Sequence, residues 1–244
     1  MKNITLLNYI GIDLNSSTHR EKIISAVGGC IGILLVFIVS NWFIGAEAAI
    51  FIIPSMGASA VLLFAAPHSP LAQPWNVFGG HIISAVVGVI CAQFVPIAAI
   101  AAALSVGLAI GAMYYARCIH PPGGATALAA VIGGAQIHSL GFEYIITPVL
   151  VNMMTILTVA LLFNYLFKWR RYPVYLTLED DKSTSAIDNY GPISHADLVY
   201  ALSEIDSFID VTEEDLLKIY KLATGRNVNA GVGPVKTIDD RGQI

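Results

Sequence analysis

The sequence Arg117-Cys-Ile-His-Pro-Pro-Gly-Gly-Ala-Thr-Ala-Leu128 interrupts a long apolar part of this 244-residue chain. Only three residues between Ile23 and Leu166 carry a full formal charge. A soluble domain needs a polar outer face, so this stretch predicts several membrane-spanning helices. The Pro-Pro-Gly-Gly break frees backbone polar groups at membrane depth, where only protein or a water-filled cavity can satisfy them. The break is therefore the first place to look for a functional site.

The composition is typical of a membrane protein. Hydrophobic residues make up 56% of the chain and charged residues 12%, and the mean hydropathy is +0.70. The charges are segregated, because 13 of the 17 acidic residues and 6 of the 13 basic residues follow Pro173. An acidic tail without a basic stripe argues against nucleic-acid binding. The three cysteines lie in apolar surroundings, and we expect them to be buried free thiols.

The apolar part divides into four long and two shorter segments. A helix needs roughly 20 apolar residues to cross a bilayer, and four segments are long enough: Ile23–Ser40, Val77–Phe94, Ile97–Ala116 and Tyr144–Leu166. The two shorter segments are interrupted by Pro and Gly, at Pro54-Ser-Met-Gly57 within Glu47–Ala66 and at the start of residues 121–136. Because Pro removes a helical hydrogen bond and Gly lowers helix propensity, each shorter segment is expected to begin a helix inside the membrane.

These segments predict an all-α polytopic membrane protein in two related halves. The expected domains are a cytoplasmic N-terminus at 1–22, a transmembrane domain at 23–172 and an acidic cytoplasmic tail at 173–244. The tail carries two stretches with capping residues and helical spacing of apolar residues, which predict two short amphipathic helices.

The two interrupted segments resemble each other. Pro54-Ser-Met-Gly-Ala-Ser-Ala60 aligns with Pro121-Pro-Gly-Gly-Ala-Thr-Ala127, and both fit Pro-x-x-Gly-Ala-(Ser/Thr)-Ala. A chance match is the alternative, since the whole region is rich in Ala and Gly. However, a polar turn and then a full span follow each copy. Paired, interrupted segments in two halves of a chain point to the central site of a transporter.

Positive charge predicts the topology. Basic residues flank the membrane part at both ends, at Arg20, Lys22, Lys168, Arg170 and Arg171, which places both termini in the cytoplasm and requires an even number of crossings. Two arrangements remain: six crossings in inverted halves, or four crossings with two re-entrant segments in parallel halves. The first would put Arg117 on the cytoplasmic side, which favours six. We expect a bacterial inner-membrane protein, and Gly- and Ala-rich helices make a homo-oligomer plausible.

Residues 117–128 resemble the signature of the HPP family of integral membrane proteins, named for its His-Pro-Pro tripeptide. A second conserved block of that family resembles Gly57-Ala-Ser-Ala-Val-Leu-Leu-Phe64, Ser69-Pro-Leu-Ala-Gln-Pro-Trp-Asn76 and Gly79-Gly-His81. The resemblance covers nearly the whole membrane part. It implies a cytoplasmic extension, which in some members ends in CBS domains. Because plastid and cyanobacterial members are associated with nitrite transport, it also implies nitrite or nitrate as the solute.

The chemistry of the break indicates an anion site. A helix that begins inside the membrane presents unpaired N–H groups and the positive end of its dipole, which together attract an anion. The candidate substrate-binding residues are Gly57, Ala58, Ser59, His81, Arg117, His120, Gly123, Gly124, Ala125 and Thr126. Three of them have simpler explanations. Arg117 could reach the lipid headgroups, His120 could cap the Pro-Pro turn, and His81 could serve helix packing.

The sequence therefore favours membrane transport of a small inorganic anion bound at two helix N-termini. The alternative is a non-transporting scaffold or sensor that signals through the acidic tail. An enzyme is not expected, because the histidines lack metal-ligand spacing and no intramembrane acid accompanies them, and no cofactor is expected. No nucleotide-binding motif is present, so the protein is expected to be a secondary transporter or a channel. Uptake of an anion against the membrane potential would need a coupling ion. His81 or His120 could carry a proton for this purpose, since histidine titrates near neutrality.

Overall fold

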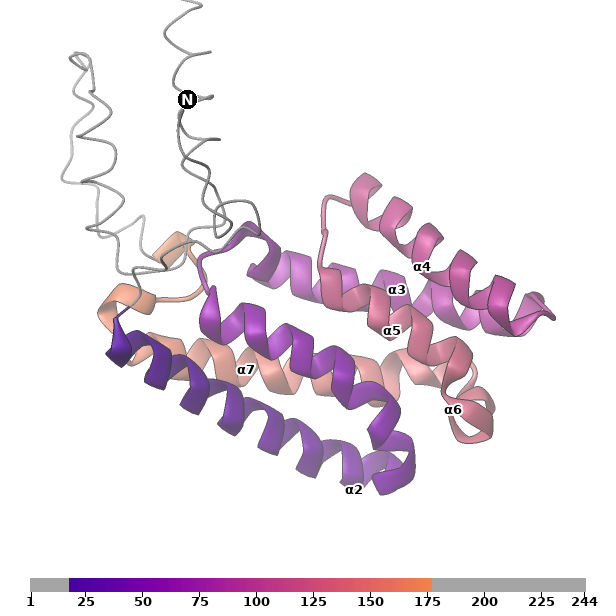
Figure 1. The fold of residues 1–244 in the computed structure, drawn as a ribbon, viewed down its shortest axis with the longest axis horizontal. Helices are drawn as coiled ribbons and strands as arrows, with labels where there is room; N and C mark the ends of the chain where they lie inside the picture. Colours follow the sequence, from indigo (N-terminus) through magenta and orange to yellow (C-terminus); the bar gives the residue numbers. More distant parts are fainter. Residues whose placement is uncertain (1–17, 177–244) are drawn as a thin grey trace, which may run out of the picture. The chain divides into compact units, whose positions relative to one another are not determined.

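The computed structural model describes residues 18–176, with only the backbone for 46–49 and 51. Every regular element within that range is helical (Figure 1). The main elements are α2 (His19–Ala65), α3 (Pro74–Phe94), α4 (Ala98–Tyr115), α5 (Pro121–Ile132), α6 (Gly134–Leu140), the π-helical η2 (Ile145–Leu150) and α7 (Val151–Tyr165). Two short 3-10 turns complete them, η1 (Pro70–Ala72) and η3 (Lys168–Arg170). The tail helices expected after residue 190 lie outside the described residues.

The expected set of membrane segments is confirmed. Four helical stretches are long and apolar enough to cross a bilayer: His19–Gly45, Pro74–Phe94, Ala98–Tyr115 and Ile145–Tyr165. Two shorter apolar helices accompany them, Ile52–Ala65 and Pro121–Ile132. The outer faces carry large exposed apolar side chains, such as Leu34, Trp42 and Phe94. Because soluble proteins rarely expose so much apolar surface, these faces fit a lipid environment.

The break in α2 lies at Gly45 and not at Pro54, so the expected helix start at Pro54 is wrong. The backbone is helical on both sides of Gly45, whose φ of 74° bends the helix into two limbs. Glycine adopts this conformation at little cost, which explains the position of the bend. Pro54 lies inside the second limb, as proline often does in membrane helices. By contrast, α5 begins at Pro121 as expected, with His120 as its N-cap.

The chain runs back and forth, and both ends of the described region meet at one end of the bundle (Figure 1). Glu21, near the start of α2, pairs with Arg170, which follows α7. The loop between α4 and α5 reaches the start of α3, where Asn76 Nδ2 donates to Ile119 O at 2.9 Å. The η1 turn before α3 also contacts the last described residues, because the Tyr172 hydroxyl donates to Ala72 O at 2.6 Å.

Four stretches are long and apolar enough to span a bilayer, and six crossings stay a prediction from the two shorter helices. The second limb of α2 returns from the Gly45 bend to the Arg170 end, where the Phe64 carbonyl contacts Arg170. The α5–α6 segment leads from the loop after α4 to η2 and α7, and its α5 has only 12 residues. Arg117 lies in that loop, beside the start of α3, where Trp75 Nε1 donates to the Ala116 carbonyl at 3.3 Å. The structure does not assign the Arg170 end to the cytoplasm, which stays a prediction from the flanking positive charge.

Glycines allow α3 and α5 to pack closely. A Cβ added at Gly80 would lie 2.5 Å from His120 Cβ, and one at Gly88 would lie 2.6 Å from the Ala127 carbonyl. A Cβ at Gly123 would lie 2.7 Å from Ser84 Oγ. Such small-residue contacts bring membrane helices together.

The cysteines are free, as expected. Cys91 and Cys118 are buried, but Cys30 is exposed on α2, so the expected burial of all three is wrong.

Candidate functional site

Five buried polar side chains meet between the second limb of α2, α3 and the start of α5. We call them the histidine–hydroxyl cluster: Ser55, Ser59, His81, His120 and Thr126. Each is at most 1% exposed. Polar groups at this depth are costly unless they are hydrogen-bonded, so their contacts with one another decide what they can do.

Ser59 lies at the centre of the cluster. Its Oγ is 2.9 Å from His81 Nε2 and 2.9 Å from His120 Nε2. The two imidazole rings are 4.9 Å apart between centroids, at an angle of 66°. One hydroxyl therefore bridges two histidines that come from positions 39 apart in the sequence.

The cluster continues from both histidines. His81 Nδ1 is 2.8 Å from Thr126 Oγ1, which is 2.6 Å from Ser55 Oγ. At the other side, His120 Nδ1 is 2.8 Å from the Leu71 carbonyl oxygen. The polar atoms thus form one continuous chain from Ser55 to Leu71.

Local sequence explains how these side chains come together. Gly80 lets the His120 backbone approach α3 directly beside His81. The residue before a proline is held in an extended conformation, and His120 has φ −139° and ψ 102° ahead of Pro121. Ser55 and Ser59 are one helical turn apart, so they share a face of α2. Thr126 lies one turn after Pro122, whose carbonyl accepts a hydrogen bond from Ser55 at 3.0 Å.

Of the residues expected from sequence, the structure brings together Ser59, His81, His120 and Thr126. Gly123 is buried nearby, where it packs against Gly80 and Ser84. The others lie apart from these side chains: Gly57, Ala58, Arg117, Gly124 and Ala125. Ala58 and Arg117 are exposed, and the remaining three are half-buried.

The expected pair of facing helix N-termini is wrong. Gly57, Ala58 and Ser59 lie inside the second limb of α2, so their N–H groups belong to a continuous helix. The start of α5 offers few donors, because Pro121 and Pro122 have no N–H. The Gly123 N–H already donates to the His120 carbonyl at 2.8 Å. The donors of this site are therefore side chains and not backbone amides.

Arg117 has a backbone role at the end of α4. Its φ of 54° is the left-handed conformation that usually belongs to glycine after a helix. The next residue, Cys118, donates its N–H to the Met113 carbonyl at 3.0 Å, which closes the helix end. The Arg117 side chain is exposed at the loop and does not enter the cluster.

Sequence reasoning missed Ser55, the Leu71 carbonyl and Tyr144. Ser55 and Ser59 are four residues apart, and this spacing would have indicated that Ser55 shares a helix face with Ser59. The expected helix start at Pro54 hid this signal, because it placed Ser55 at the first turn of a helix. A backbone carbonyl leaves no signal in a sequence. Tyr144 is buried just before η2 and donates to the Thr126 carbonyl at 2.8 Å, a partner that only the fold reveals.

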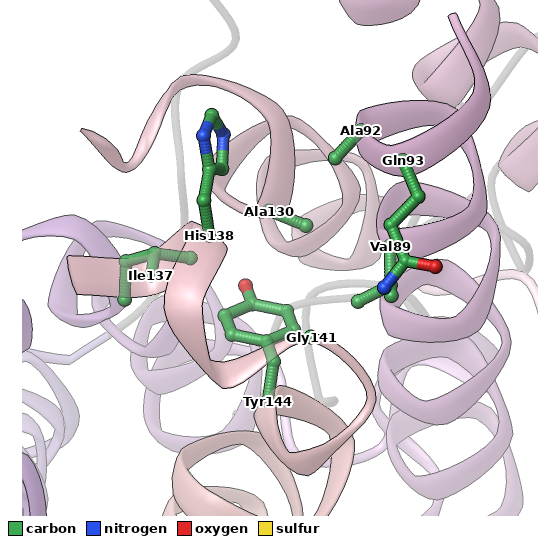
Figure 2. Close-up of a pocket in the computed structure, with 8 residues that line it drawn as sticks. All are labelled: Val89, Ala92, Gln93, Ala130, Ile137, His138, Gly141 and Tyr144. Carbon is green, nitrogen blue, oxygen red and sulfur yellow. The ribbon is translucent and has the colours of Figure 1, made fainter. Parts of the chain in front are cut away.

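A cavity of about 190 Å³ lies between residues of α3, α5 and α6 and Tyr144 (Figure 2). It is lined by Val89, Ala92, Gln93, Ala130, Ile137, His138, Gly141 and Tyr144. Tyr144 joins this cavity to the cluster, because its hydroxyl donates to the carbonyl of Thr126, whose side chain contacts His81. Three of the lining side chains can donate hydrogen bonds: Gln93, His138 and Tyr144.

The chemistry of the cluster is hydrogen bonding and proton transfer. The residues that the structure describes contain no group of three His, Cys, Asp or Glu that could hold a metal ion. Two imidazoles and three hydroxyls can each donate and accept. An imidazole can also take up a proton and become a cation.

Residues 14–173 match the transmembrane region that defines the HPP proteins. This chain belongs to the HPP family. Two transmembrane proteins of Dictyostelium discoideum are each 45% identical to it, one over 149 residues and the other over 128. The first match covers 59% of this chain and 48% of the relative, and the second covers 51% and 45%. The HPP chain thus spans about half the length of these relatives. No solved structure matches it significantly.

Proposed function

We propose that this HPP protein transports a small monovalent anion, nitrite or nitrate, together with a proton, and that the histidine–hydroxyl cluster is the coupling site. The observation that carries this proposal is the burial of two histidines and three hydroxyls, in mutual contact, within an apolar helical bundle. Ionisable side chains inside a membrane are costly and usually belong to substrate or proton pathways. The choice of nitrite or nitrate rests on the family resemblance.

A proton on the cluster favours an anion beside it. The helical stretches around the two rings, residues 52–65, 74–94, 98–115 and 121–132, contain no Asp, Glu, Lys or Arg. These stretches give an imidazolium there no counter-ion, and a lone buried charge is unfavourable. An anion cancels that charge. Proton and anion therefore each strengthen binding of the other, as linkage requires.

The cavity of Figure 2 offers a place for the anion close to the cluster. Gln93 offers an amide donor to an anion with acceptor oxygens. Tyr144 and His138 would first have to leave the carbonyls of Thr126 and Val131, which lie 2.8 and 2.7 Å from them. At the other end of the bundle, the exposed Arg117 raises the local anion concentration, an effect that salt screens.

Flux into liposomes tests this proposal. Purified full-length protein is reconstituted, and uptake of nitrite, nitrate and chloride is measured under an inward proton gradient. His81→Gln and His120→Gln keep hydrogen-bonding groups but cannot take up a proton at neutral pH. Each should lower uptake by about one to two decades, the equivalent of one lost charge-assisted hydrogen bond of roughly 1.5–3 kcal/mol.

His68→Gln is the matched control, because His68 lies in the turn before α3 and contacts the Arg171 carbonyl instead of the cluster. It should transport like the wild type. If both cluster variants take up anions as the wild type does, the cluster is not part of the transport pathway. A folded wild type that moves none of the three anions would contradict transport and favour the scaffold or sensor alternative.

A further inference from the structure

The five contacts that run from Ser55 to the Leu71 carbonyl can all be hydrogen bonds at once in only one direction when both histidines are neutral. In that direction the Ser59 hydrogen follows the chain and does not point to the Ser55 carbonyl, which lies 3.2 Å away. The Leu71 carbonyl can only accept, so His120 Nδ1 must carry the hydrogen of that 2.8 Å bond. A neutral imidazole has a hydrogen on one nitrogen only. His120 Nε2 is then an acceptor, and the single hydroxyl hydrogen of Ser59 must point to it.

The same argument fixes the rest of the chain. Ser59 has no second hydrogen, so its 2.9 Å contact with His81 requires a hydrogen on His81 Nε2. His81 Nδ1 is then an acceptor and takes the Thr126 hydroxyl hydrogen at 2.8 Å. Because Thr126 has now used its hydrogen, the 2.6 Å contact between Thr126 and Ser55 requires Ser55 to donate. In this state the Ser55 hydrogen takes the shorter of its two contacts and leaves the Pro122 carbonyl at 3.0 Å.

We propose that Ser55, Thr126, His81, Ser59 and His120 form a proton relay whose resting hydrogen bonds all point toward the Leu71 carbonyl. In this state His81 carries its hydrogen on Nε2 and His120 carries its hydrogen on Nδ1. The two histidines are therefore opposite tautomers, and Ser59 connects them.

The relay moves one proton by a series of short transfers. A proton that arrives at Ser55 displaces the Ser55 hydrogen to Thr126 and the Thr126 hydrogen to His81 Nδ1. The Nε2 hydrogen of His81 passes to Ser59, and the Ser59 hydrogen passes to His120 Nε2. His120 then carries hydrogens on both nitrogens and one positive charge, while His81 is neutral with its hydrogen on Nδ1. No bond other than O–H and N–H forms or breaks.

The cluster holds one proton at a time. A second proton would put positive charges on two rings whose centroids are 4.9 Å apart, and like charges at that distance oppose ionisation of both. Tyr144, bonded to the Thr126 carbonyl, and Cys118, packed at Gly79, are titratable side chains near the rings. Cys91 lies further along α3, and Tyr114 and Tyr115 lie exposed at the end of α4. The stretches 52–65, 74–94, 98–115 and 121–132 contain no carboxylate to balance a second charge.

The role of the relay in anion coupling rests on the proposed function, but its direction can be tested without any flux. Full-length protein labelled with ¹⁵N-histidine is studied by solid-state NMR in lipid vesicles, with signals assigned through His81→Gln and His120→Gln. At neutral pH, the hydrogen should lie on Nε2 of His81 and on Nδ1 of His120. The same tautomer on both rings would overturn the proposal, whether or not the protein transports an anion.

Acid titration in the same vesicles tests the connection through Ser59. In the wild type, the first proton should be shared, so that the signals of both rings move together. Ser59→Ala removes the bridge, and one ring should then titrate alone. Ser105→Ala is the control, because Ser105 donates only to the Ala102 carbonyl of its own helix, and both rings should still move together. Separate titration of the two rings in the wild type would overturn the relay.

Discussion

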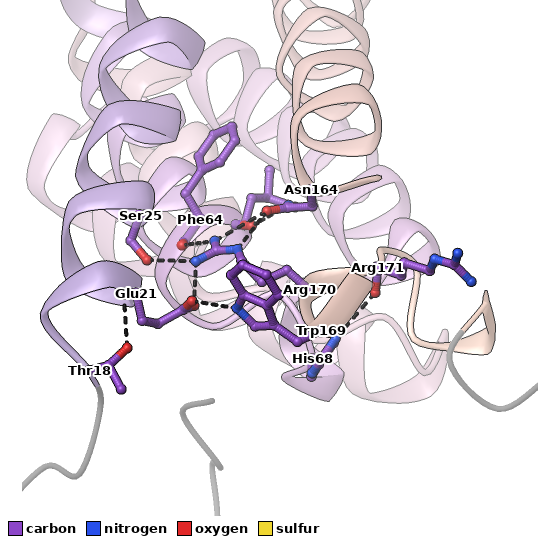
Figure 3. Close-up of polar contacts among 10 residues, drawn as sticks. Thr18, Glu21, Ser25, Phe64, His68, Asn164, Trp169, Arg170 and Arg171 are labelled. Atoms are coloured by element: carbon purple, nitrogen blue, oxygen red, sulfur yellow. Dashed lines mark hydrogen bonds and ion pairs between the residues drawn. The ribbon is translucent and has the colours of Figure 1, made fainter. Parts of the chain in front are cut away.

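At the scale of single residues, Arg170 holds the two ends of the membrane part together (Figure 3). Its side chain is fully buried and pairs with Glu21. It also donates to Ser25 Oγ at 3.0 Å, to Asn164 Oδ1 at 3.2 and 3.3 Å, and to the Phe64 carbonyl. Burial lowers the pKa of the Arg170 guanidinium from its ordinary value, and the Glu21 carboxylate opposes this shift. The charge is stable there because its neighbours satisfy it.

Glu21→Gln should therefore destabilise the protein strongly. Removal of one partner leaves a buried charge without its counter-ion, which costs roughly 3–5 kcal/mol. Thermal unfolding in detergent measures the effect as a fall in Tm. Arg20→Gln is the control, because Arg20 only stacks on the Trp169 ring at 4.4 Å, a contact that contributes about 0.5–1 kcal/mol when exposed. If both variants lower Tm by the same amount, the buried Glu21–Arg170 pair contributes no more to stability than the exposed Arg20 contact.

At the scale of elements, the close approach of α3 to α5 positions the two histidines. Gly80→Ala tests this, because its new Cβ would lie 2.5 Å from His120 Cβ and 3.2 Å from the Cys118 carbonyl. Overpacking of this kind costs about 1–3 kcal/mol, and the shift of α5 should separate His120 from Ser59. The measurements are Tm and the histidine ¹⁵N signals.

Gly111→Ala on α4 is the matched control, because a Cβ there meets nothing within 4 Å. Alanine is the better helix former, so this change should be neutral or stabilising by up to about 1 kcal/mol. If Gly80→Ala leaves both Tm and the histidine signals unchanged, glycine packing does not hold the cluster in place.

The elements also show what could be predicted from sequence. Hydropathy identified the four long helices, and Pro121 identified the start of α5, because both follow from local chemistry. The break near Pro54 was misplaced, since a membrane helix tolerates Pro while the φ of 74° at Gly45 requires glycine. The pairing of His81 with His120 depends on how α3 packs on α5, which no local pattern reveals. The Leu71 carbonyl, which sets the direction of the chain, has no side-chain signal at all.

At the scale of the whole molecule, we propose that the histidine–hydroxyl cluster couples one proton to one monovalent anion. Both ends of the described region lie at one end of the bundle, joined by Arg170, and the cluster lies between helices that cross in opposite directions. The helical stretches around it, residues 52–65, 74–94, 98–115 and 121–132, supply no charged side chain. A single proton and a single anion together leave the site neutral, which is the favourable state inside a membrane.

The most direct test measures proton entry and anion entry in the same liposomes, with a pH-sensitive dye inside and nitrite or nitrate outside. We predict one proton for each anion, and a rate that does not change when a potassium gradient with valinomycin sets the membrane potential. The double variant His81→Gln/His120→Gln should lose both fluxes together. Anion entry without proton entry, or a double variant that performs like the wild type, would contradict the account.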